Sequence, residues 1–161
     1  MKYVAIVLTV LTVLALGFSG YVVYTSNAQI TDIGYQVALA ADQEALFSDV
    51  RASVEDRLEN VVVLNEDVDL SNLQDYVLVT YSITLKNRDI LPYEWFDISL
   101  TGKDGDVAYL KSDMPDIPAH EENTVTLTLL TSRERIDYSR EIKIDYFFYA
   151  NEKSVTLTAG A

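Results

Sequence analysis

The chain has 161 residues and a formal net charge of -13, which results from 25 acidic and 12 basic residues. This charge repels phosphate backbones, so the composition excludes nucleic acid as an expected partner. The sequence contains no cysteine, which excludes disulfides, thiolate metal ligands and a cysteine nucleophile. Once a membrane segment is set aside, the remaining length has room for one ordinary domain with its own core.

Residues 1–28 predict a transmembrane anchor. The stretch from residue 3 to residue 24 is almost entirely apolar, and no charge occurs between Lys2 and Asp32. A helix needs about 20 apolar residues to cross the hydrocarbon core, so we expect residues 3–24 to contact the lipid bilayer. The cation before the anchor and the acids after it predict a single-pass membrane protein with a cytoplasmic N-terminus and an extracytoplasmic C-terminal domain.

A cleaved secretory signal is the competing interpretation of this segment. The small residues in Ser26-Asn27-Ala28 and in Ala15-Leu16-Gly17 have the spacing of a cleavage site. Cleavage would release the same domain as a secreted protein. The hydrophobic region of a signal runs about 7 to 15 residues, so the greater length here favours a retained anchor.

Residues 29–75 predict an acidic helical connector and a linker. We expect a helix over residues 32–60, with charged residues on one side and an apolar face that packs on the following domain or forms a stalk. Four apolar residues recur in it at every fourth position: Leu46, Val50, Val54 and Leu58. The acidic, turn-rich residues 65–75 are expected to link this helix to the domain.

From Tyr76 the apolar residues recur at every second position, which is typical of half-buried strands. The expected strands cover residues 76–86, 96–100, 124–129, 142–148 and 155–157, with shorter ones at 61–64 and 107–110. Strands of this length without intervening helical patterns predict two antiparallel sheets packed face to face. Residues 76–161 are therefore expected to form a mainly β domain, an immunoglobulin-like antiparallel β-sandwich.

Several short segments follow the order found in one known family. These are Tyr81-Ser-Ile-Thr-Leu-Lys-Asn87, Leu91-Pro92, Ile98-Ser-Leu100, and Ile117-Pro-Ala119 leading into Val125-Thr-Leu-Thr-Leu129. This order resembles the late-embryogenesis-abundant, water-stress β-sandwich domains over roughly residues 76–157. The family's usual Asn-Pro-Asn is replaced by Asn87-Arg88-Asp89. The resemblance implies a binding or protective module without catalytic residues.

Few residues suggest chemistry. His120 is the single histidine, and its polar turn predicts a solvated side chain rather than a catalytic or metal-binding one. Asp67 with Asp69, and Asp104 with Asp106, could offer oxygens to Ca²⁺, but neither pair has the spacing of an EF-hand loop. Gly105 between the second pair predicts a hairpin turn with a positive φ. No catalytic residue, cofactor or metal is expected.

The aromatic cluster of residues 91–96 contains the two candidate partner-binding residues, Tyr93 and Trp95. Aromatic side chains near loops are frequent binding anchors. A single tryptophan in a small sandwich more often fills the core, so we expect Trp95 to be buried and Tyr93 to be its more exposed neighbour.

Three classes of function follow from the sequence. The favoured one is a non-catalytic membrane-anchored module with a binding or structural role at the cell envelope, whose partner is an unknown envelope protein or polymer. The second is a pilin-like filament subunit, because a hydrophobic helix followed by an amphipathic helix and a β domain is the pilin plan. The first glutamate is Glu44, so the acidic residue near the start of a pilin helix is missing. The third is an enzyme or a metal-dependent carrier, which only the acidic turns support.

Overall fold

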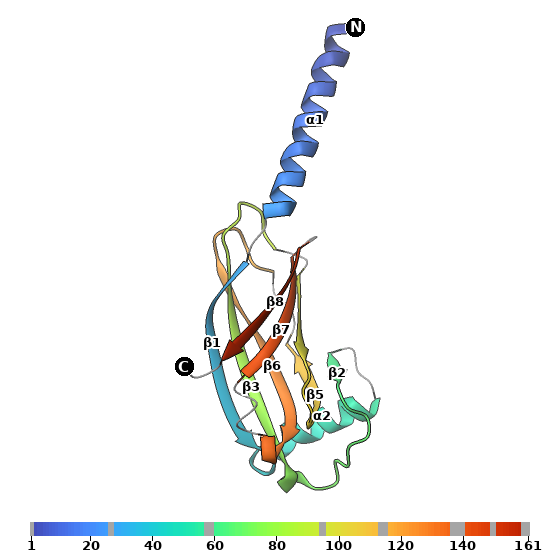
Figure 1. Ribbon diagram of the computed structural model, residues 1–161, viewed down its shortest axis with the longest axis vertical. Helices are drawn as coiled ribbons and strands as arrows, with labels where there is room; N and C mark the ends of the chain where they lie inside the picture. Colours follow the sequence, from blue (N-terminus) through green and yellow to red (C-terminus); the bar gives the residue numbers. More distant parts are fainter. Residues whose placement is uncertain are drawn as a thin grey trace.

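The structure is a computed structural model that describes residues 2–25, 28–56, 60–93, 96–112, 116–135, 141–148 and 151–158. The protein is mainly β, with a long apolar helix that precedes antiparallel sheets (Figure 1). Its helices are α1 Lys2–Thr25 and α2 Glu44–Asp56, with short 3-10 helices at Ala40–Asp42, Leu73–Asp75 and Arg133–Arg135. Its strands are β1 Ala28–Leu39, β2 Val61–Val63, β3 Tyr76–Asn87, β4 Phe96–Thr101, β5 Asp106–Lys111, β6 Glu122–Ser132, β7 Glu141–Phe148 and β8 Asn151–Thr158.

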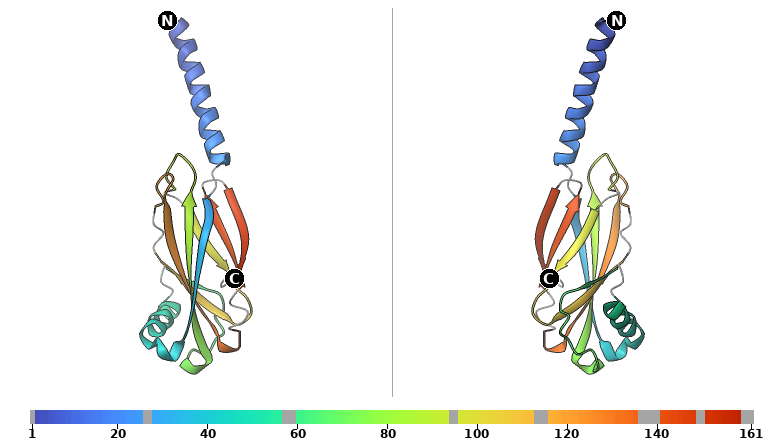
Figure 2. Two further views of the ribbon diagram at one scale, coloured as in Figure 1. Left: turned by 90° about the vertical axis from the view of Figure 1, so that its left-hand side faces the viewer. Right: turned by 90° about the vertical axis from the view of Figure 1, so that its right-hand side faces the viewer.

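Helix α1 extends away from the strands at one end of the molecule (Figures 1 and 2). Its segment Tyr3–Tyr21 has a mean hydropathy of 2.1, and it is long and apolar enough to cross a membrane. The hydroxyls of Thr9 and Thr12 donate hydrogen bonds of 2.9 Å to the carbonyls of Ala5 and Leu8. The hydroxyls of these two threonines are thus satisfied within the helix, as a lipid environment requires.

Residues 28–39 form strand β1, so the prediction of helix from residue 32 is wrong over this segment. Strand β1 pairs antiparallel with β3, from Ala28 opposite Asn87 to Leu39 opposite Val77. A register shift between Ile30 and Asp32 adds a residue to this strand. The bulge brings two apolar residues of different alternation phase, Ile30 and Ile33, against the same core. The apolar helix α1 therefore leads into a strand and not into an amphipathic helix, which departs from the pilin plan.

The strands form two antiparallel sheets. The larger has five strands in the order β1-β3-β6-β5-β2, and the smaller has three in the order β4-β7-β8. Every strand expected from the alternating pattern is present. The five-stranded sheet includes two strands from the expected connector, since β1 pairs with β3 and β2 pairs with β5. The β structure therefore begins at Ala28 and not at Tyr76.

Buried side chains from both sheets belong to one hydrophobic cluster. The predicted alternation of β3 is confirmed, since its odd-numbered residues from 77 to 85 are all buried in this cluster. The cluster consists of Val77, Val79, Tyr81, Ile83, Leu85, Tyr93, Ile98, Leu100, Tyr109, Ile117, Val125, Leu127 and Leu129. Strand β4 of the smaller sheet contributes Ile98 and Leu100.

A second cluster lies where helix α2 packs on the larger sheet. Phe47 and Val50 of the helix are buried there with Leu78, Val107 and Leu130 from three strands. Within the predicted range 32–60 an amphipathic helix is thus present, and among the described residues it covers Glu44–Asp56. Leu46 and Val54 are partly buried as expected, while Leu58 lies outside the described residues.

Candidate functional site

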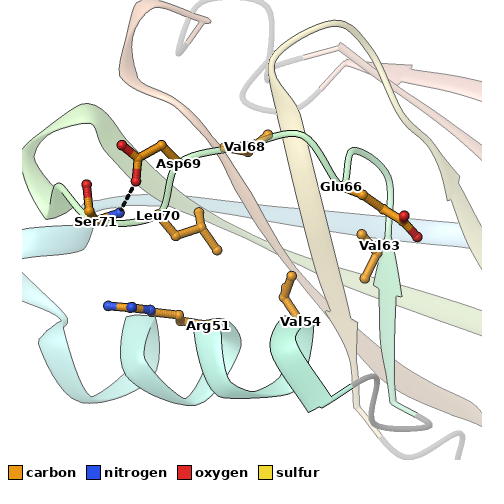
Figure 3. Close-up of a pocket in the computed structure, with 8 residues that line it drawn as sticks. All are labelled: Arg51, Val54, Val63, Glu66, Val68, Asp69, Leu70 and Ser71. Atoms are coloured by element: carbon orange, nitrogen blue, oxygen red, sulfur yellow. Dashed lines mark hydrogen bonds between the residues drawn. The ribbon is translucent and has the colours of Figure 1, made fainter.

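An open groove of about 500 Å³ lies between helix α2, strand β2 and the loop that follows β2 (Figure 3). Four of its side chains are apolar and four are polar or charged. The lining residues are Arg51, Val54, Val63, Glu66, Val68, Asp69, Leu70 and Ser71. Its volume falls within the range of small-ligand sites, which is about 300 to 1,000 Å³.

Side-chain hydrogen bonds fix the loop that borders this groove. The side-chain oxygen of Asn65 accepts a hydrogen bond from the backbone N–H of Asp67 at 3.1 Å. Asp69 Oδ1 accepts one from the N–H of Ser71 at 2.9 Å (Figure 3). Such bonds replace a backbone turn and are the reason why Asn and Asp favour loops. The Tyr76 hydroxyl donates to the Asp69 carbonyl at 2.7 Å, which ties the loop to strand β3.

The charges around the groove are mixed. Hydrogen bonds from the side chain and the backbone of Ser71 lower the pKa of the Asp69 carboxyl; desolvation opposes them, and the positive charge of Arg51 adds a smaller lowering. Asp69 is therefore ionised at neutral pH. The apolar side chains beside one guanidinium and two carboxylates can accommodate a small apolar group with polar edges. The lining residues include no histidine that could activate the Ser71 hydroxyl.

Tyr93, expected to be the more exposed neighbour of Trp95, is buried, with 1% of its surface exposed. Its hydroxyl donates to the carboxylate of Asp89, and its backbone forms a bridge with Ile117 through hydrogen bonds of 2.9 and 3.0 Å. The ring lies in the hydrophobic core cluster. We therefore no longer propose Tyr93 as a partner-binding residue. Trp95, the other candidate, lies outside the described residues.

Asn87 has a structural role that was not predicted from its sequence context. It is fully buried, and its Nδ2 donates to the carbonyls of Leu91 at 2.8 Å and Ile117 at 3.0 Å. Its Oδ1 accepts from the N–H of Asp89 at 2.8 Å. One side chain thus holds residues 88–91 against a second loop. The signal was present as a strand that ends in Asn before a Pro-containing turn.

The acidic turn between β4 and β5 is closed by its own hydrogen bonds. The positive φ expected of Gly105 is confirmed at 88°, but the hairpin is wrong because β4 and β5 belong to different sheets. Asp106 Oδ2 accepts from the N–H of Lys103 at 2.7 Å, and Oδ1 accepts from the Thr131 hydroxyl at 2.8 Å. His120 lies in a separate turn, where it is exposed and has a φ of 65°.

We expect Ca²⁺ to leave the thermal unfolding midpoint of the full chain unchanged. Both oxygens of Asp106 are engaged, and within the described residues no three His, Asp or Glu side chains come together as metal ligands. Unfolding should be followed by circular dichroism in detergent micelles with Ca²⁺ and with a chelator. A midpoint that rises strongly with Ca²⁺ would show that one of the acidic turns is a metal site, because a ligand that binds the folded state stabilises it.

No family model, curated protein or solved structure gives a significant match to the chain. Its function must therefore be inferred from its own residues and their arrangement.

Proposed function

We propose that the protein is a single-pass membrane-anchored module whose β domain lies on the extracytoplasmic side and has a non-catalytic binding or structural role at the cell envelope. The observation that carries this proposal is the exposure of every described side chain of α1, from Tyr3 to Tyr21. Apolar surface left in water costs about 25 cal/mol per Å². A bilayer removes this cost.

The length of α1 supports a spanning helix. It has 24 residues, and at 1.5 Å per residue it measures about 36 Å, against about 30 Å for the hydrocarbon core. Lys2 stands at one end, and the first charge after the helix is Asp32. The positive-inside tendency then favours a cytoplasmic position for Lys2 and an outer position for the strands.

We further propose that the two sheets form an immunoglobulin-like sandwich related to the water-stress domains. The hydrophobic cluster shared by β3, β6 and β4 supports a sandwich, because such a core lies between facing sheets. Two segments that carry the resemblance, the end of β3 and the Ile117 turn, are joined by the side chain of Asn87. The role that this proposal assigns is recognition or protection of an envelope protein or polymer, without catalysis.

A cysteine introduced at Gln74 should react with a membrane-impermeant maleimide in intact cells that express the full chain. Gln74 is exposed, and the chain has no cysteine of its own, so any labelling reports the new thiol. A Tyr3→Cys variant provides the control at the proposed cytoplasmic end of α1 and should react only after the cells are dissolved in detergent. Labelling of the Gln74→Cys variant only after lysis would show that the domain faces the cytoplasm.

A further inference from the structure

The loop between β3 and β4 exposes two large apolar side chains. Ile90 is 59% exposed and Leu91 is 42% exposed. Among the side chains that the structure describes, these are the only exposed large hydrophobic ones outside helix α1. The exposure of two neighbouring apolar side chains to water at the tip of a loop is energetically unfavourable.

This loop lies at the end of the sheets that is nearest to α1 (Figures 1 and 2). The pairing of Ala28 with Asn87 places the start of β1 beside the residue that precedes the loop. Ala28 is three residues beyond Thr25, where α1 ends, and three residues span at most about 11 Å. Asn87 is therefore held close to the end of the membrane helix by chain connectivity, whatever the tilt of that helix.

The loop is also fixed in shape. The three hydrogen bonds of the buried Asn87 side chain hold Asp89, Leu91 and the Ile117 turn together. The hydroxyl of the buried Tyr93 adds a bond to the Asp89 carboxylate. A surface that is already ordered loses little conformational entropy when it contacts a partner.

We propose that Ile90 and Leu91 enter the interfacial layer of the bilayer that α1 spans, so that this loop is a second membrane contact. The inference rests on the proposed anchor. The head-group layer adds about 5 to 8 Å on each side of the hydrocarbon core, and a loop joined so closely to the helix end can reach it. Arg88 is exposed beside the two apolar residues and can meet a lipid phosphate.

The charges at this end favour zwitterionic over anionic lipid. Asp116, Glu121 and Glu122 are exposed in or beside the neighbouring turn, and Glu122 forms an ion pair of 2.9 Å with Lys86. A contact at the loop in addition to the helix restricts the tilt of the domain. It thereby sets which faces of the two sheets are presented to a partner away from the membrane.

The test uses single-cysteine variants of the full chain, labelled with a fluorophore and reconstituted into phosphatidylcholine vesicles. Ile90→Cys probes the loop, and Leu91→Cys repeats the measurement if the first variant does not fold. Gln74→Cys is the water control, because β3 has 12 residues and separates it from the loop by about 40 Å. Leu16→Cys in α1 is the lipid control. Each label is exposed to lipids with a nitroxide high on the acyl chain and to iodide in the water.

The label at Ile90 should be quenched by the nitroxide lipids and protected from iodide several-fold relative to the label at Gln74. If the label at Leu16 is in lipid while the label at Ile90 behaves like that at Gln74, the loop contact is wrong and the anchor stands. If the label at Leu16 is open to iodide as well, both the anchor and the loop contact are overturned.

Discussion

Replacement of Phe47 by alanine should lower the free energy of unfolding by about 3 to 5 kcal/mol, which is the usual range for a large buried aromatic side chain. Phe47 is 2% exposed and lies on helix α2. Its ring centroid is 6.1 Å from that of Tyr76, and it shares a cluster with Leu78 and Val107 of the larger sheet. The variant would leave a cavity between the helix and the sheet and would lose the burial that holds α2 in place.

The measurement is denaturant unfolding of the full chain in detergent micelles. Asp49→Ala serves as the control on the same helix, because Asp49 is exposed, and it should change stability by no more than about 0.5 kcal/mol. If Phe47→Ala costs less than about 1 kcal/mol, helix α2 does not pack on the sheet as described.

Replacement of Asn87 by alanine should cost about 3 kcal/mol. The side chain is fully buried, and its removal takes the donor from the Leu91 carbonyl and the acceptor from the Asp89 N–H, while the Ile117 carbonyl keeps only the N–H of Tyr93. A buried polar group that loses its hydrogen-bond partner costs about 1 to 3 kcal/mol. The effect should exceed that of a surface asparagine, since the buried position of Asn87 limits the access of water to the groups that lose their bonds.

Asn123→Ala is the matched control in the same unfolding experiment. Asn123 Nδ2 donates to the Asp116 carbonyl at 3.2 Å at an exposed position, so water can replace this bond. We expect a loss of about 1 kcal/mol or less. Equal losses for the two variants would mean that Asn87 does not hold residues 88–91 in place.

Local patterns predicted the elements whose burial follows a simple period. The alternation from Val77 to Leu85 predicted β3, because one face of that strand is buried along its whole length. The recurrence of Leu46, Val50 and Val54 predicted α2 for the same reason. Strand β1 was missed although Ile33, Tyr35, Val37 and Leu39 alternate, since the bulge after Ile30 interrupts the phase and the following helical spacing was extended backwards.

Features that depend on distant segments could not be read from the sequence. Tyr93 was expected to be the more exposed neighbour of Trp95, but it packs in the core cluster beside the Ile117 turn, which is distant in the sequence. The separation of β4 and β5 into different sheets depends on pairing with β7 and β6. The groove beside Arg51 forms only where α2, β2 and the loop after β2 meet.

The retained anchor is tested most directly by fractionation of cells that express the full chain, followed by mass analysis of the product. The proposed function predicts that the protein stays in the membrane pellet after alkaline carbonate extraction, with residues 2–25 still attached. A spanning helix resists this extraction because its apolar surface remains in lipid. Recovery of a soluble product that begins near Gln29 would show that the segment is a cleaved signal, and it would contradict the membrane-anchored module.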